Sequence, residues 1–145
     1  MKGYSRLLIS STLLIVFFAL PTAASELEDA AADAVAAAFM SARQAAHLTK
    51  LGRLGKNTFR EKVCRHDMRF PSGLINDVFY ETSDPDQLPE SAQRLATSPD
   101  TGKTAARFGV GICLVKPASL GKPIYSVLIA TYESRHTSFW RVFWE

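Results

Sequence analysis

Residues 107–133, RFGVGICLVKPASLGKPIYSVLIATYE, decide the fold that this chain is expected to adopt. Residues 107–116 alternate in the manner of a strand, and one face carries Phe108, Val110, Ile112 and Leu114. Residues 124–133 predict a second strand, and the intervening turn contains Gly121, so the two strands form a hairpin. Gly109 and Gly111 weaken a strand intrinsically, so we expect another element to pack closely over their face.

Two further segments have the composition of strands. Leu74–Thr82 (LINDVFYET) would place Val78 and Tyr80 on one face and Phe79 on the other. Phe139–Trp144 (FWRVFW) is expected to follow the hairpin as the third strand of a C-terminal antiparallel meander.

Three helices are predicted before the hairpin. The alanine-rich segment Glu26–Lys50 predicts the first, because alanine is the best helix former. A capping box, with Thr58 as N-cap and Glu61 three residues later, predicts a second helix over Phe59–His66. A short third helix begins near Pro89 and ends before Ser98-Pro99.

The alanines of the first helix fall on one stripe, which lets another element approach closely. That stripe comprises Leu27, Ala31, Ala34, Ala38, Ala42 and Ala45, with Val35 and Phe39 beside it. N-terminal helices followed by a C-terminal meander indicate an α+β fold. Residues 25–145 are long enough for one such domain with a core of its own.

Residues 1–24 have the three parts of a secretory signal. Lys2 and Arg6 precede an apolar run over residues 7–20, and small residues follow Pro21. Fourteen helical residues rise about 21 Å, whereas a membrane span needs roughly 30 Å. We therefore expect cleavage after Ala24, no stable membrane span afterwards, and export to the periplasm or the extracellular space; an uncleaved anchor is the alternative.

The charge of the chain gives no indication of a nucleic-acid partner. The full sequence has 17 basic and 14 acidic residues, a net charge of +3. Two of the basic residues and none of the acidic ones lie in residues 1–24, so the exported chain carries +1. A charge this small does not predict binding to nucleic acid or to an anionic membrane.

The chain has two cysteines, Cys64 and Cys113. An even number of cysteines in an exported protein favours a disulfide, and two buried thiols are the alternative. The bridge would close a loop of about 50 residues and stabilise the fold by about 4 kcal/mol in the chain-entropy model. A Cys–His zinc site is not expected, because His66 lies too close to Cys64 for the usual spacing.

The stretch from Glu81 to Tyr132 resembles the second half of a CAP domain, the SCP or pathogenesis-related family. Glu81 is followed by a short helix that ends in ATSP (residues 96–99), then by FGVG (residues 108–111) and by the tyrosine-containing YSV (residues 125–127). The resemblance covers about half of the exported chain. It implies an α-β-α sandwich and a secreted setting.

The resemblance does not bring a complete metal site with it. The family's divalent-metal cleft uses two histidines and two acidic residues, and the only matches here are Glu81 and, in the same broad region, His66. These two are the weak metal candidates of this sequence. No catalytic or cofactor-binding motif stands on its own, and no cofactor is expected.

Three functions therefore remain open. The first is a small exported CAP-like binding domain without its own catalysis, whose partner would be a protein, a glycan or an apolar ligand. The second is an exported metal-dependent hydrolase that uses Glu81 and His66. The third is a carrier of apolar small molecules, because Trp140 and Trp144 would share one face of the last predicted strand, which is either buried or exposed for binding.

Overall fold

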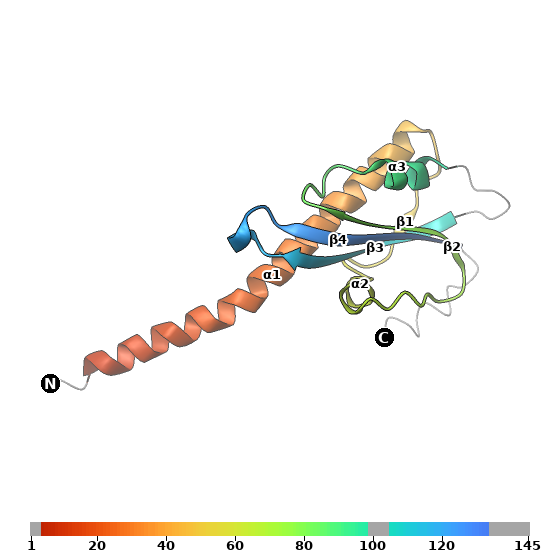
Figure 1. Cartoon of the computed structure of the whole chain (residues 1–145). Helices are drawn as coiled ribbons and strands as arrows, with labels where there is room; N and C mark the ends of the chain where they lie inside the picture. The colour runs from red at the N-terminus through yellow and green to blue at the C-terminus, as the bar shows by residue number, and fades with distance from the viewer. Residues whose placement is uncertain (1–3, 99–104, 134–145) are drawn as a thin grey trace.

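A computed structural model describes residues 4–98 and 105–133, with residues 4–23 as backbone alone (Figure 1). Three helices and four strands make up this part, together with one short 3-10 turn at Ala118–Leu120. In chain order the elements are α1 (Tyr4–Ala45), β1 (Gly52–Arg53), α2 (Arg60–Arg65), β2 (Leu74–Thr82), α3 (Glu90–Thr97), β3 (Ala105–Lys116) and β4 (Ile124–Glu133).

The strands form one mixed sheet in the order β1-β3-β4-β2. The predicted hairpin is confirmed: β3 and β4 are antiparallel, with Val110 opposite Ile129. β2 pairs antiparallel with the other edge of β4, so the third antiparallel strand precedes the hairpin in the chain. The short strand β1 runs parallel to β3 and was not predicted, because two residues carry no periodicity. The predicted strand Phe139–Trp144 lies outside the described residues.

Helices cover both faces of this sheet, so the α+β single-domain fold is confirmed. Figure 1 shows α1 and α3 on one side and α2 on the other. The α1 side holds the larger core, which includes Val35, Phe39, Leu95, Phe108, Val110, Ile112, Val127 and Ile129. The α2 side holds a smaller core of Leu54, Phe59, Val63, Leu128, Ala130 and Tyr132.

The close packing expected over the two glycines of β3 is confirmed, and Phe59 is the residue that packs there. A Cβ atom placed on Gly111 would lie 2.7 Å from the backbone carbonyl carbon and oxygen of Phe59. A Cβ atom on Gly109 would meet the ring of the same residue. The absence of these two side chains is therefore what allows the start of α2 to lie against the sheet.

Two histidines end helices in the left-handed conformation. His47 has a φ of 58°, and the Leu48 N–H donates to the Arg43 carbonyl at 3.0 Å, which is the hydrogen bond of a Schellman motif. His66 has a φ of 54° and ends α2 with the corresponding bond from Asp67 to Lys62. Glycine is the usual residue at this position, so a histidine there does not indicate in the sequence that a helix ends. The prediction that the first helix continues to Lys50 was therefore wrong, and α1 ends at Ala45.

The predicted capping box at the start of α2 was also wrong. The Thr58 hydroxyl donates to the Leu54 carbonyl at 2.6 Å instead of capping the helix, and α2 has no side-chain cap. Glu61 forms an ion pair with Arg65 at 3.0 Å. The third helix is close to its prediction, with Pro89 before its first residue and Ser98 after its last.

The N-terminal half of α1 extends away from the sheet (Figure 1). Among the α1 side chains that are described, the first buried one is Glu28, and Ser25, Glu26 and Leu27 before it are exposed. In the part of the chain whose side chains are described, none of the helices has the combination of length and apolar residues that a bilayer-spanning helix requires.

Candidate functional site

The open edge of β3 is closed by groups from the preceding loop and from α1. β1 covers only Arg107 and Phe108 on this edge. The Asn57 side chain continues the pairing, because it accepts from the Ile112 N–H at 2.7 Å and donates to the Ile112 carbonyl at 3.2 Å. The edge therefore offers few unpaired backbone groups to a second chain.

The carboxylate of Glu28 is the last of the groups that close this edge of β3, and Glu28 is only 2% exposed. Its Oε2 accepts from the Leu114 N–H at 3.1 Å. Its Oε1 accepts a hydrogen bond from Arg60 Nε at 3.1 Å and forms an ion pair with Arg60 Nη2 at 3.0 Å. Glu28 thus joins α1 to β3 through the Leu114 N–H, and to α2 through an ion pair with the partly exposed Arg60.

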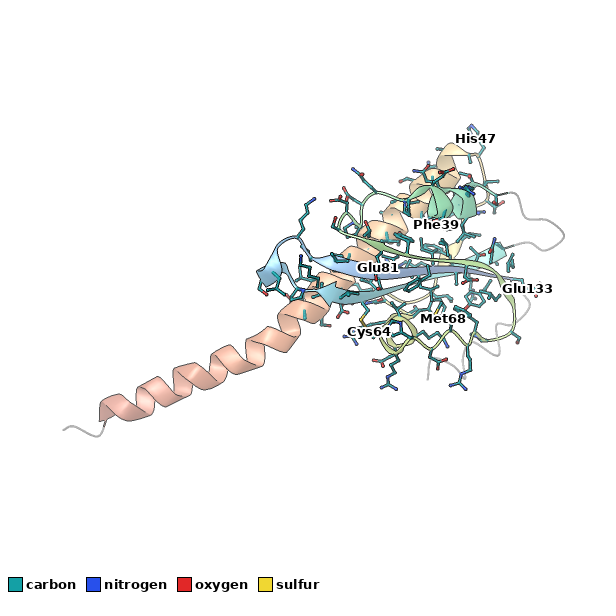
Figure 2. The ribbon with its side chains drawn as sticks, in the orientation of Figure 1. Phe39, His47, Cys64, Met68, Glu81 and Glu133 are labelled. Carbon is teal, nitrogen blue, oxygen red and sulfur yellow. A yellow bond between two sulfur atoms is a disulfide. The ribbon has the colours of Figure 1, made fainter. Side chains whose placement is uncertain are left out.

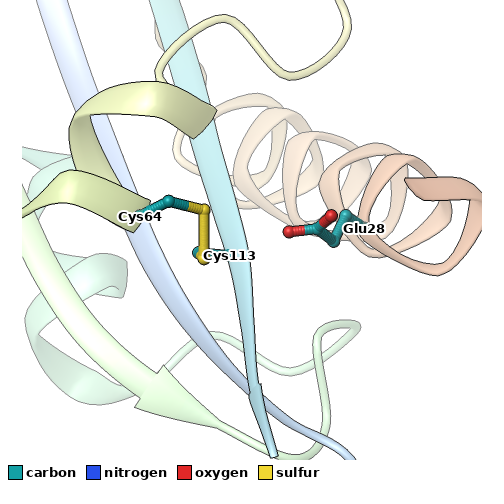
Figure 3. Close-up of side chains that lie close together, drawn as sticks. All are labelled: Glu28, Cys64 and Cys113. Atoms are coloured by element: carbon teal, nitrogen blue, oxygen red, sulfur yellow. A yellow bond between two sulfur atoms is a disulfide. The ribbon is translucent and has the colours of Figure 1, made fainter. Parts of the chain in front are cut away.

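The predicted disulfide between Cys64 and Cys113 is confirmed, and it lies beside Glu28 (Figure 3). It joins α2 to β3, with 5.3 Å between the two Cα atoms and 49 positions between the cysteines in the sequence. Both cysteines are half-buried. We call Glu28, Arg60, Cys64 and Cys113 the edge cluster, because all four lie at the edge of β3.

The edge cluster also contains the one group of metal-ligating side chains in the described part of the chain. The ligand atoms of Glu28, Cys64 and Cys113 all lie within 4.8 Å of one another. Sequence reasoning did not single out Glu28 for this role, because its carboxylate looks like an ordinary first-turn acid of the predicted helix.

The structure brings neither weak metal candidate into such a group. Glu81 is exposed on β2, opposite Ser126 on β4, and lies on the sheet face that α2 partly covers (Figure 2). His66 is exposed, and its backbone ends α2. Neither residue belongs to the cluster of three ligands, and the predicted binding face of Trp140 and Trp144 lies outside the described residues.

A groove of about 820 Å³ runs between α1 and α3. Most of the residues from α1 are alanines of the predicted stripe, so the C-terminal half of the stripe lines a groove, and Ala42 also packs against the larger core. The full lining is Ala38, Ser41, Ala42 and Ala45 from α1, Ala46 just after it, Asp86, Gln87 and Leu88 from the loop before α3, and Gln93 and Thr97 from α3.

Buried Arg43 fixes the two helices that border this groove. Its Nε and Nη2 donate to the Thr49 carbonyl at 3.1 and 2.9 Å, and its Nη1 donates to the Ala96 carbonyl at 3.4 Å. These acceptors lie just after α1 and in the last turn of α3, where a cation complements the helix dipole. We interpret Arg43 as the residue that holds the groove's two walls together.

Tyr80 is a buried polar group that faces the larger core from β2. Its hydroxyl has no hydrogen-bond partner among the described residues. Burial raises the pKa of this phenol well above its usual value, so the side chain stays neutral at physiological pH. It does not line the groove.

Comparison with known proteins found none that is similar to this chain. No family model, curated protein or solved structure matches it.

Proposed function

We propose that this chain is a small exported binding domain of the CAP-like type, without catalysis of its own, and that the groove between α1 and α3 holds its ligand. The observation that carries the proposal is the composition of that groove, which is lined mainly by alanines on the α1 side and mainly by polar side chains on the α3 side. Its volume of about 820 Å³ lies within the range of roughly 300–1,000 Å³ that is usual for ligand sites.

The polar groups on the α3 side favour an extended peptide as the ligand. Gln87 and Gln93 offer side-chain amides, which can pair with the N–H and C=O groups of a peptide backbone. Asp86 adds a carboxylate, which would pair with a basic side chain of the ligand. The small alanine side chains leave room for a backbone to approach α1 closely. The described lining contains no aromatic side chain, so a flat ring has no stacking partner there.

The walls of the groove are held in place before any ligand binds. Arg43 links the end of α1 to the last turn of α3, and Gln93 Nε2 donates to the Leu88 carbonyl at 3.0 Å. Preorganisation of this kind lowers the entropic cost of binding. It supports a binding role for a groove that is open to solvent.

We infer export from the signal-like residues 1–24 together with the disulfide. A disulfide persists in a non-reducing environment, which is compatible with the periplasm or the extracellular space. Cleavage after Ala24 would remove none of the buried side chains described, because burial begins at Glu28. The helix–sheet–helix layering supports the CAP-like part of the proposal.

Export predicts a particular mass for the protein purified from its own host. We expect a chain that begins at Ser25 and is lighter, before reduction, by the two hydrogen atoms that a disulfide lacks. Intact-mass spectrometry with and without reductant measures both features. A chain that still contains residues 1–24, or that has two free thiols, would contradict the export proposal.

The groove is tested by filling it with a larger side chain. Ala45→Phe should block the groove, whereas Ala37→Phe adds the same ring at an exposed position of α1 outside it. Short random peptides displayed on phage are selected on the wild-type protein, and the enriched peptides are measured by fluorescence anisotropy. We expect Ala45→Phe to weaken binding by at least about tenfold, which corresponds to 1.4 kcal/mol, and Ala37→Phe to leave it unchanged.

Asp86→Asn should also reduce the preference of the selected peptides for lysine and arginine. The proposal is wrong if no peptide is enriched, or if enriched peptides bind the Ala45→Phe variant as tightly as the wild type. Circular dichroism of both alanine variants separates blocked binding from loss of the fold.

A further inference from the structure

We propose that the reduced form of this protein binds Zn²⁺ through Cys64, Cys113 and Glu28. This site is separate from the groove and does not depend on the peptide-binding proposal. It follows from the edge cluster, in which the two sulfur atoms and the carboxylate lie within 4.8 Å of one another (Figure 3).

The three side chains form a ligand set that suits zinc. Thiolates favour zinc over the harder divalent cations, and a carboxylate oxygen is an accepted third ligand. Three protein ligands leave one position of a tetrahedral ion for water, and the half-buried cysteines allow water to reach it.

Glu28 has an oxygen that is still able to bind a metal. Both contacts of Arg60 with Glu28, the hydrogen bond from Nε and the ion pair with Nη2, are made to Oε1, whereas Oε2 accepts a hydrogen bond from the Leu114 N–H. Each carboxylate oxygen has two lone pairs, so Oε2 keeps one for the ion. Arg60 and the Leu114 N–H would then orient the carboxylate, as outer hydrogen-bond partners do in metal sites.

The charges of the edge cluster also balance around a divalent ion. Two thiolates and one carboxylate carry three negative charges, and Zn²⁺ and the Arg60 guanidinium together carry three positive charges. A neutral cluster avoids the large desolvation cost of an uncompensated charge beside the buried Glu28.

Zinc and the disulfide exclude one another at this site. A dithiol reductant supplies two electrons and two protons, so that the S–S bond breaks, two thiols form and the reductant becomes a disulfide. Zn²⁺ then displaces the two thiol protons and binds the sulfur atoms as thiolates. Either the covalent bond or the ion joins α2 to β3. When a small-molecule disulfide takes up two electrons from the two thiolates, it is reduced to two thiolates, the S–S bond of the protein forms again and the Zn²⁺ is released.

Co²⁺ tests the proposal, because thiolate coordination gives it a charge-transfer absorption that oxygen ligands do not. The full chain is titrated with Co²⁺ after reduction by a phosphine and, separately, in its oxidised form, and Zn²⁺ is then added in competition. We expect the band in the reduced protein only, and we expect Zn²⁺ to abolish it. Cys64→Ser and Cys113→Ser should each remove it.

Glu28→Gln decides whether the carboxylate is a ligand, and Glu61→Gln is its control. Glu61 lies on α2 and also contacts Arg60, at 3.5 Å, but it is outside the cluster of ligands. Glu28→Gln should weaken Co²⁺ binding by about 100-fold, while Glu61→Gln should not change it.

Reduction also removes a stabilising cross-link, so circular dichroism is recorded at each titration point. If the reduced chain is unfolded without metal, Zn²⁺ should restore its helix signal, and Glu28→Gln should require more metal to do so. The absence of a thiolate band in the reduced protein would overturn the proposal. Equal affinity in the wild type and Glu28→Gln would overturn it as well.

Discussion

Replacing Arg60 with methionine is expected to lower the free energy of unfolding by about 3–5 kcal/mol, the usual cost of leaving a buried charge without its partner. The Glu28 side chain is 3% exposed, whereas that of Arg60 is 42% exposed. Removal of the arginine therefore leaves a carboxylate that water cannot easily reach. The Leu114 N–H would remain as its one described hydrogen-bond donor.

Urea unfolding of the oxidised protein measures this loss, and Arg65→Met is the matched control. Arg65 belongs to the same helix and pairs with Glu61, but both side chains are more than half exposed, so the change should cost less than about 1 kcal/mol. Adding Glu28→Gln to Arg60→Met should recover much of the stability, because the buried charge is then absent. Equal losses for Arg60→Met and Arg65→Met would contradict the account of the edge cluster.

The strands β2 and β3 could be predicted from the sequence because their side chains alternate with a period of two, whereas β4, which is buried on both faces, is a continuous run of mainly apolar residues. Leu74–Thr82 and Ile124–Glu133 have the predicted bounds, and the two faces of β3 are those expected from Phe108 and Gly109. The register of the hairpin follows from the same alternation, since a slip of one residue would turn every apolar side chain to the opposite face. β1 was not predicted because it pairs with a strand that is distant in the sequence, and because its two residues are too few to show an alternating pattern.

The helix ends were harder to predict because they depend on backbone conformation. His47 and His66 occupy a left-handed position that glycine usually takes, and a histidine gives no signal of that geometry. Thr58 and Glu61 have the spacing of a capping box, but each side chain instead contacts a residue four positions away, Leu54 and Arg65 respectively. A local motif of two residues does not outweigh such contacts.

The candidate sites depend on contacts between distant parts of the chain. The disulfide could be predicted because the two cysteines of this chain have one possible intramolecular pairing. The position of Glu28 beside it could not, since 86 residues separate Glu28 from the Leu114 N–H that binds it. Similarly, the alanine stripe predicted a close approach to another element, and only the fold shows that Ala38, Ala42 and Ala45 line a groove.

A side chain added to a glycine of β3 should have the second large effect on stability. It should destabilise the protein, whereas strand propensity alone predicts that it stabilises. Gly111→Ala should lower the free energy of unfolding by about 3 kcal/mol, although alanine in a strand usually stabilises by roughly 0.5–1 kcal/mol relative to glycine. The new Cβ atom would lie 2.7 Å from the backbone carbon and oxygen of Phe59, so α2 has to move away from the sheet.

Gly52→Ala is the control for this change, because it introduces the same methyl group into the neighbouring strand. Its Cβ atom would lie 3.7 Å from the Ala106 carbonyl oxygen, which is an ordinary contact, so its effect should stay within about 0.5 kcal/mol. Thermal and urea unfolding of both variants compare the two sites directly.

Because Cys64 lies on α2 and Cys113 on β3, a displaced helix should also strain the cross-link between them, and the reduced Gly111→Ala protein should unfold at a lower urea concentration than either change alone produces. If Gly111→Ala is as stable as Gly52→Ala, then α2 does not lie against β3 as closely as the positions of Phe59 and Gly111 require.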